Sequence, residues 1–158
     1  MKILKIQALR GPNIWSVQRK KLIQMRLDLE EMEQFPTNKI EGFRERIEAM
    51  FPTMIEHRCS EGCRGGFFSR VDRGTWMGHV IEHIALEIQT LAGMETGFGR
   101  TRETKTPGVY NVVFSYTEEN VGLFAAESAV AIAESLIAGT EYDVEADIQK
   151  MREIRERV

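Results

Sequence analysis

The stretch from Thr75 to Ala92 constrains the fold of this chain more than any other, because two opposite sides of it have helical spacing. Apolar side chains recur every three or four residues, and at about 100° per residue they cover about 100° of a helix circumference. They are Met77, Val80, Ile81, Ile84, Ile88 and Leu91. The pattern predicts an amphipathic helix with Thr75 as N-cap, ending at Gly93, whose apolar stripe lies in the core.

The other side of this helix holds His79, Glu82 and His83 in the spacing H-x-x-E-H of the inverted zinc-peptidase motif. Histidines at i and i+4 lie about 40° apart on a helix, so both can bind one cation. The alternative is an ordinary amphipathic helix whose polar face holds two histidines by chance. The metal site is favoured because two of the three histidines lie here. Trp76 and Leu86 on the same side indicate a pocket wall.

A catalytic zinc needs a third protein ligand and an open position for water. Cys59 is the first candidate, because a thiolate suits zinc and the residue lies in a Gly- and Arg-rich stretch shortly before the helix. Glu127 and Glu134, on one face of a later helix, are the alternatives, although each alone is typical of an exposed glutamate. Three roles remain open for His57: a metal ligand, a residue that hydrogen-bonds to a metal ligand, or a surface residue. Cys63 is interpreted as an ordinary loop cysteine.

These residue types predict metal-assisted hydrolysis. Water bound to zinc has a pKa of about 7. Glu82 would take a proton from this water and later deliver one to the leaving nitrogen. An arginine would stabilise the anionic intermediate. Arginines beside glutamates also fit a substrate with both carboxylates and guanidinium groups, and we assign this binding to Arg64, Arg70 and Arg100. Each of them is otherwise a solvated surface charge.

The glycines between Cys59 and Phe67 do not form a phosphate cradle. Neither G-x-x-x-x-G-K-[ST] nor G-x-G-x-x-G occurs in the chain. ATP chemistry is therefore not supported by these residues, and the glycines are interpreted as tight turns or sites of close backbone approach.

Four segments have the features of β-strands. Residues 23–29 alternate apolar and polar side chains, which predicts a strand with one buried face. The others are residues 1–9, 97–103 and 109–116. The last two are joined by a turn with Pro107-Gly108, which is typical of a hairpin.

Three further segments have helical patterns, namely residues 38–51, 117–137 and 143–158. Asn38 and Glu41 resemble a capping box at the start of the first, and Gly139 terminates the second. Residues 58–73, rich in glycine and arginine, are expected to form a loop. About four strands and about four helices, without strict βαβ alternation, predict an α+β fold with a mostly antiparallel sheet.

The composition is that of a soluble globular protein. Its 158 residues, 42% of them hydrophobic, suffice for one core, and the net charge of −3 gives no general reason to expect nucleic acid. Two cysteines are too few for a disulfide framework, and the chain has neither an export signal nor a membrane-length apolar run, so we expect a cytoplasmic protein. We expect one domain over residues 1–140 and a charged C-terminal helix over residues 141–158 that leads to further domains.

Three sequence blocks resemble the N-terminal domain of cyanophycin synthetases: LRGPN at residues 9–13, EHRCSEG-x-RGGF at residues 56–67 and RGTWMGHVIEHIALEIQ at residues 73–89. The resemblance extends over nearly the whole chain. It implies a large homo-oligomeric ligase that extends a poly-aspartate chain bearing arginine on each side chain. ATP and Mg²⁺ would act in ATP-grasp and Mur-ligase-like domains downstream of this one.

The resemblance also implies a role for this domain. In that family it is thought to bind the growing cyanophycin polymer, and in many members it resembles a metallopeptidase that cuts polymer into short primers. His79, Glu82 and His83 match that site, whereas the ligand role of Cys59 is an inference from its chemistry. S-ribosylhomocysteinase is similar in joining H-x-x-E-H to a cysteine ligand, and pitrilysin-type peptidases use a downstream glutamate. Two hypotheses result: a zinc hydrolase that generates primers, or a non-catalytic domain that anchors the polymer.

Overall fold

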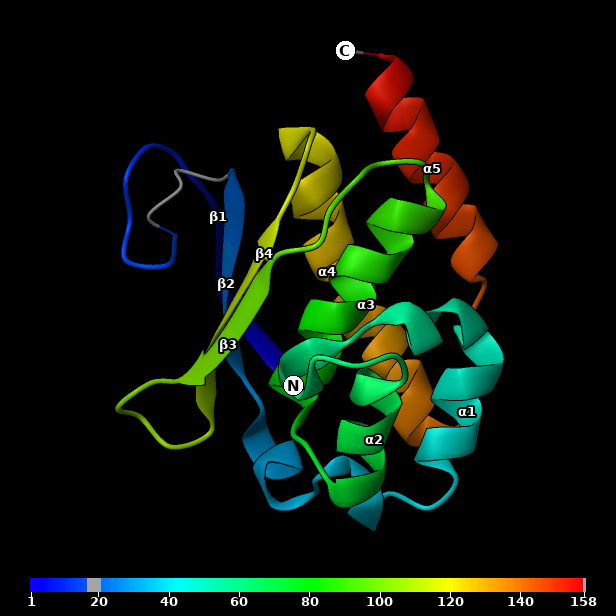
Figure 1. The fold of residues 1–158 in the computed structure, drawn as a ribbon. Helices are drawn as coiled ribbons and strands as arrows, with labels where there is room; N and C mark the ends of the chain where they lie inside the picture. The colour runs from blue at the N-terminus through cyan, green and yellow to red at the C-terminus, as the bar shows by residue number, and fades with distance from the viewer. Residues whose placement is uncertain (17–20, 158) are drawn as a thin grey trace.

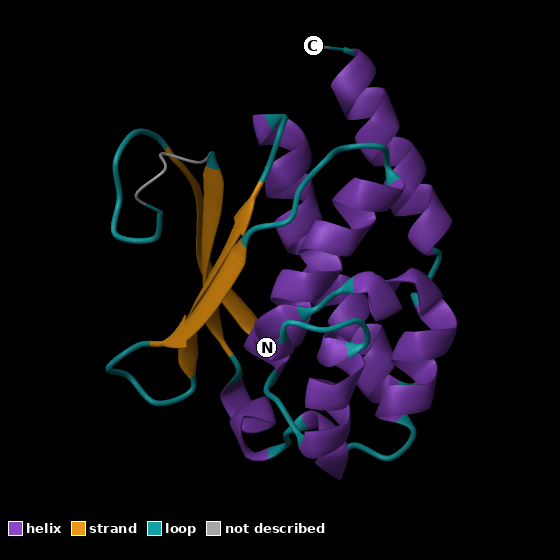
Figure 2. Ribbon diagram, viewed as in Figure 1, coloured by secondary structure: helices purple, strands orange, loops and turns teal. Residues whose placement is uncertain are grey.

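The strands form one antiparallel sheet with helices packed on one face (Figures 1 and 2). The computed structural model describes residues 1–16 and 21–157. The strands are β1 (Lys2–Leu9), β2 (Leu22–Asp28), β3 (Gly99–Glu103) and β4 (Val109–Ser115), in the spatial order β1-β2-β4-β3. The predicted α+β class is confirmed, and so are the four strands to within two residues at each end.

The alternation in β2 places its side chains as predicted. Ile23, Met25 and Leu27 are fully buried in the main core, which lies between the sheet and the helices. Leu22 and Val113 form a small cluster with Trp15. Strand β2 therefore has one face buried in the main core.

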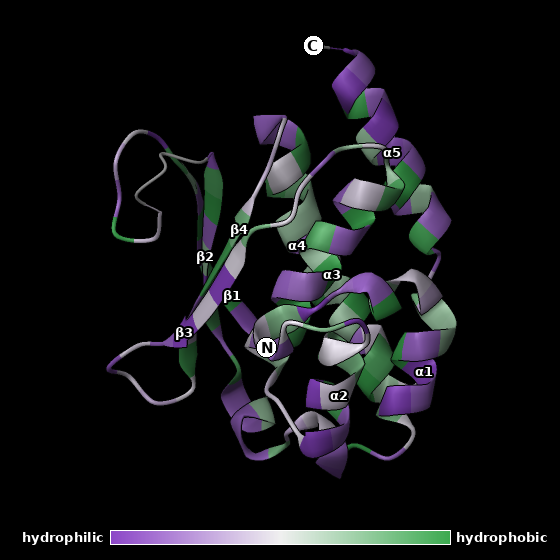
Figure 3. Ribbon diagram, viewed as in Figure 1, coloured by the Kyte–Doolittle hydropathy of each residue, from purple (hydrophilic) through white to green (hydrophobic). Residues whose placement is uncertain are grey.

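Five α-helices lie in the described residues: α1 (Phe43–Met50), α2 (Gly66–Arg73), α3 (Met77–Leu91), α4 (Glu119–Ala138) and α5 (Val144–Glu156). Helix α3 packs on β3 and β4, and α4 packs on β1 and β2 beside α3. Helix α4 is largely hydrophobic and α5 largely hydrophilic (Figure 3). This arrangement makes α3 a central element with neighbours on both sides.

The two C-terminal helices belong to this core. Ile148 and Met151 of α5 are buried in it, and Asp143 caps α5 by accepting a hydrogen bond from the Ala146 N–H with its side chain. By length and composition α4 could cross a membrane, which differs from the expectation that no run was long enough. However, 61% of its apolar window is buried inside the domain, as is typical of a core helix.

The predicted capping box at Asn38 is wrong. Residues 37–39 form a 3₁₀ turn, and α1 begins at Phe43 after Gly42. The polar side chains of this turn bind elsewhere: the Thr37 hydroxyl donates to the Val71 carbonyl, and the Asn38 amide donates to the Arg73 carbonyl. They attach the turn to α2 and are not available to cap a helix.

Residues 58–73 are not the predicted loop. They contain the 3₁₀ turn η4 (Cys59–Glu61) and helix α2, and the 3₁₀ turn η3 (Pro52–Glu56) precedes them. A further 3₁₀ turn, η1 (Glu30–Gln34), follows β2, and η2 (Thr37–Lys39) is the turn described above. Phe67, Phe68 and Val71 anchor α2 in the core. Gly66 makes this possible, because a Cβ atom there would overlap the carbonyl oxygen of Arg58.

Candidate metal centre

The motif on α3 lies inside the protein and not on its surface. Glu82 and His83 are each only 6% exposed, and Glu87 one turn later is 3% exposed. These residues and His79 border a cavity of about 1080 Å³ between α3, the η3–η4 segment and β3. The predicted pocket wall is thus confirmed, with Trp76 and Leu86 among its lining residues.

Cys59, His79 and His83 meet at one point of this cavity. One donor atom from each lies within 4.8 Å of the other two, and Cys59 Sγ is 3.1 Å from His79 Nε2. Cys59 has φ of +56°, which turns the chain into η4 and directs the sulfur toward α3. One thiol and two imidazoles are a donor set that suits zinc.

The alternative third ligands lie elsewhere. Glu127 and Glu134 are exposed on α4 and do not line the cavity. Glu134 forms an ion pair with the N-terminal ammonium group of Met1. Cys63 is exposed and is not part of the cluster. Of Cys59, Glu127 and Glu134, Cys59 is the one that the structure brings to both histidines of the motif.

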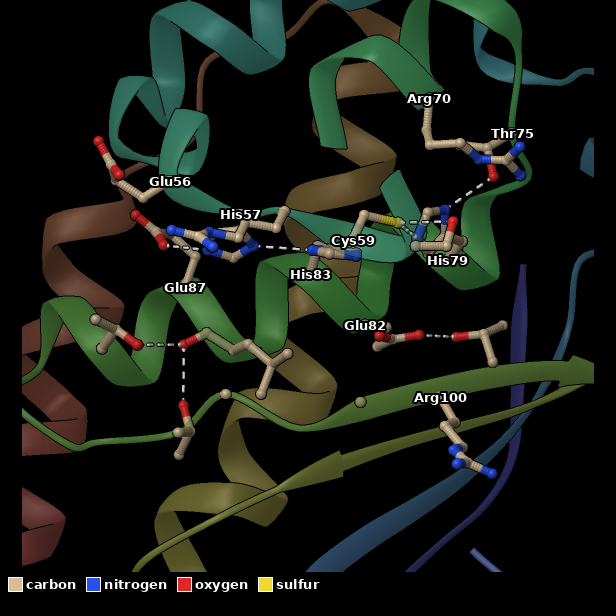
Figure 4. A pocket seen from close by; sticks show the side chains of 18 of the residues that line it. Glu56, His57, Cys59, Arg70, Thr75, His79, Glu82, His83, Glu87 and Arg100 are labelled. Atoms are coloured by element: carbon tan, nitrogen blue, oxygen red, sulfur yellow. Dashed lines mark hydrogen bonds and ion pairs between the residues drawn. The ribbon is translucent and has the colours of Figure 1, made fainter. Parts of the chain in front are cut away.

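Hydrogen bonds fix both imidazole rings (Figure 4). His79 Nδ1 lies 2.9 Å from the Thr75 hydroxyl, which therefore bonds to the motif and does not cap α3 as predicted; Trp76 is the N-cap. His83 Nδ1 lies 2.8 Å from His57 Nδ1, and His57 Nε2 lies 2.7 Å from a Glu87 carboxylate oxygen.

This series of bonds sets the tautomers. The carboxylate of Glu87 can only accept, so His57 donates to it through Nε2–H, and in the tautomer with the proton on Nε2 the Nδ1 atom of His57 accepts from His83 Nδ1–H. The Nε2 lone pair of His83 is then free for a metal. His57 is therefore a partner of a candidate ligand, which the sequence had left open.

The pKa values agree with this arrangement. Burial, together with the nearby Arg70 charge, lowers the pKa of His79 to about 4. Burial and the neighbouring imidazoles lower the pKa of His83 well below its ordinary value. For Glu87 burial acts to raise the pKa, but hydrogen bonds from His57 and Thr53 outweigh it and lower the pKa. At neutral pH His79 and His83 are thus neutral, as metal ligands must be.

Glu82 lines the same cavity and contacts β3 directly. Burial raises its pKa to about 7, although a 2.5 Å hydrogen bond from the Thr101 hydroxyl acts in the opposite direction. Gly99 on β3 leaves room for the carboxylate, since a Cβ atom there would overlap it. A carboxyl group with a pKa near neutrality is suited to accept and return a proton.

The predicted arginines are divided between two places. Arg70 and Arg100 line the cavity, whereas Arg64 lies outside it and pairs with exposed Glu56 at 2.8 Å. Arg70 lies near Thr75 and His79, and its buried Nε has no hydrogen-bond partner among the described residues (Figure 4). Arg100 leaves β3 on the side away from Glu82 (Figure 4).

Some residues of this site were not predicted from the sequence. Glu87 follows His83 by four residues, so the helical period places it on the same face as the motif, but no role was predicted for it. Thr101 comes from a strand distant in sequence, and no local pattern connects it with Glu82. Arg58 and Arg102 also line the cavity and were not singled out.

Comparison with known proteins agrees with the sequence blocks. The profile of the cyanophycin synthase-like N-terminal domain matches residues 24–138. The cyanophycin synthetase of Synechocystis sp. is 52% identical over 157 residues, which are 98% of this chain and 18% of that protein. That of Geminocystis herdmanii is 53% identical over 156 residues, 99% of this chain and 18% of that protein.

The sequence therefore spans less than a fifth of the length of these relatives. The match covers the helical segment that carries the cluster, strands β3 and β4, and most of β2. This protein belongs to the family of cyanophycin synthase-like N-terminal domains.

Proposed function

We propose that this protein is the N-terminal domain of a cyanophycin synthetase and that it hydrolyses cyanophycin with a bound zinc ion, generating short primers. The observation that carries the proposal is that Cys59, His79 and His83 converge in the cavity that Glu82 also lines. The names of the relatives support the identity of the polymer. ATP and Mg²⁺ would be used in downstream ligase domains.

The residues present fit a zinc ion. Cys59 would supply a thiolate, and His79 and His83 would each supply Nε2, because their Nδ1 atoms are occupied by Thr75 and His57. When bound, zinc would lower the pKa of a coordinated water and polarise the carbonyl that is attacked.

The remaining steps would belong to protein side chains. Glu82 would accept the proton of the attacking water and return it to the leaving nitrogen, with Thr101 holding the carboxylate in place. Arg70 has a buried Nε without a hydrogen-bond partner in the described residues, beside the cluster. It would donate to the oxygen on which negative charge develops.

The cavity also has charges of both signs for a zwitterionic polymer. Arginines line it from two sides: Arg58 and Arg70 before α3, and Arg100 and Arg102 on β3. Glu56 lies among them. Carboxylates of the polymer would pair with the arginines, and its guanidinium groups with glutamate. The same charges favour the second candidate function, a non-catalytic domain that anchors the polymer.

The setting of the domain is part of the proposal. It would work in the cytoplasm within a homo-oligomeric synthetase, with cyanophycin and the downstream domains as partners and without nucleic acid or membrane. The mixed charge of the cavity is consistent with a zwitterionic polymer as ligand.

The experiment is incubation of the purified protein with cyanophycin, with zinc or with a chelator, followed by measurement of polymer length. We expect shortening with zinc, no shortening with chelator, and recovery when zinc is restored. Intact polymer that binds the zinc-loaded protein with strong salt dependence would contradict the hydrolase and favour the anchoring domain.

A His57→Ala substitution should weaken zinc binding by about 10- to 100-fold, because it removes the acceptor that fixes the ring of His83. Zinc affinity is measured by competition with a chromogenic chelator. Arg64→Ala, outside the cavity, is the matched control and should leave the affinity unchanged. Equal affinities for the wild type and both variants would mean that His57 does not orient a ligand.

A further inference from the structure

We propose that the free edge of β3 binds the substrate backbone as an added β-strand. The domain would then recognise the α-linked backbone of the polymer, and its branches would project to either side. This inference rests on the proposed function for the identity of the polymer, but it concerns binding and is tested without hydrolysis.

The topology leaves β3 with one unpaired edge. The sheet order places β4 on one side of β3, and among residues 1–16 and 21–157 no strand lies on the other. The Phe98 carbonyl accepts from the Ser115 N–H at 2.8 Å, and the Thr104 N–H donates to the Val109 carbonyl at 2.7 Å.

These two bonds fix which backbone groups face outward. Hydrogen-bonded pairs alternate along an antiparallel ladder, so the residues between Phe98 and Thr104 that bond to β4 are Arg100 and Arg102. The N–H and C=O groups of Gly99, Thr101 and Glu103 therefore point away from β4. An extended peptide needs such a row to pair with.

This edge borders the cavity that holds the candidate metal centre. Gly97, Gly99 and Thr101 are among its lining residues, and nothing lies within 4 Å of the place that a Cβ atom on Gly97 would take. A ligand backbone can therefore approach this end of β3 closely. The side chain of Thr101 donates a hydrogen bond to Glu82, so the outward N–H and C=O groups of β3 lie beside the proposed base.

The shape of the cavity fits an extended peptide. Its lining follows α3 from Trp76 to Leu91, a rise of about 22 Å at 1.5 Å per residue. At about 3.3 Å per residue, six or seven residues of extended peptide would fill it. His57, Arg58 and Cys59 form the opposite wall. A peptide strand paired with β3 would thus pass between β3 and the candidate metal ligands Cys59, His79 and His83.

The geometry predicts which bond is cut. Only the α-linked backbone can pair continuously with β3, whereas the β-linked arginine branches project from it. Hydrolysis would break a C–N bond of that backbone, with the hydroxyl of water adding to the carbonyl carbon and its protons going to the leaving amine and to solvent. The products would be two shorter polymers, and free arginine would not be released.

Amide hydrogen exchange, followed by NMR on the zinc-free protein, tests the binding mode. The probe is a synthetic decamer of α-linked aspartate with arginine on every side chain, which stays intact without metal. At ligand concentrations 100 times Kd, the amides of Gly99, Thr101 and Glu103 should exchange about 100-fold more slowly. The ladder amides of Arg100 and Arg102, which are already bonded, serve as the internal control.

Two N-methylated decamers complete the test, one methylated on alternate backbone amides and one methylated on every backbone amide. The first should retain binding, because the repeating chain can place its unmethylated amides toward β3, and the second should lose it, because it has no N–H left to donate. Unchanged exchange at the three outward amides, equal binding of the two decamers, or absence of binding would each overturn the inference. Protection of these amides in a protein that never cleaves polymer would refute the hydrolase alone. Cleavage without protection would refute only the strand pairing.

Discussion

Replacing Glu82 with glutamine is expected to reduce cyanophycin hydrolysis by about 100- to 10,000-fold, the range typical for loss of a positioned acid or base. Glutamine has nearly the same shape and can still bond to Thr101, but it cannot take a proton from water. The rate of polymer shortening and the zinc content are both measured. Zinc content should stay at the wild-type value, which separates loss of the base from loss of the metal.

Glu127→Gln is the matched control for this variant, because Glu127 is exposed on α4 and does not line the cavity. Its rate should equal that of the wild type. Full activity in Glu82→Gln would mean that another group takes the proton, and the proposed mechanism would then be wrong even if the protein were a zinc hydrolase.

Replacing Cys59 with serine should weaken zinc binding strongly. Loss of a residue that only hydrogen-bonds to a metal ligand typically weakens binding by about 10- to 100-fold, and loss of the ligand itself should have a larger effect. The substitution removes the sulfur atom that lies 3.1 Å from His79 Nε2. Zinc titration gives the affinity. Cobalt substituted for zinc reports the bond itself, since a cobalt–thiolate bond has a charge-transfer absorption that the serine variant would lack.

Cys63→Ser supplies the control, because this exposed cysteine is in the same segment and outside the cluster. It should retain both the zinc affinity and the cobalt–thiolate absorption. If the two serine variants bind zinc alike, the third ligand is not Cys59.

The parts of the site that were predictable from sequence are those that depend on local spacing. The helical period placed His79, Glu82 and His83 on one side of one helix, and Trp76 and Leu86 indicated a pocket there. All of this needs only the geometry of an isolated helix. The strands were predictable for the same reason, since alternation in residues 23–29 is a local signal.

The parts that were missed depend on contacts distant in sequence. Helix α2 is short and begins at a glycine, so its pattern of Phe67, Phe68 and Val71 was hidden in an apparent loop. Asn38 has a typical capping side chain, but it donates to the Arg73 carbonyl instead, and this tertiary contact outweighs the local preference. Thr75 is the exception, because its hydroxyl bonds to His79 four residues further along, so a local contact replaces the cap there.

The burial of α3 on both sides couples chemistry to stability. A buried polar group without a partner costs about 1–3 kcal/mol, and the partners His57, Thr75 and Thr101 offset that cost for the motif. A lineage that lost any one of these partners would weaken its fold as well as its reaction. A lineage that no longer needed the reaction could replace His79, Glu82 and His83 with aliphatic residues. The free energy of unfolding of its domain could then increase.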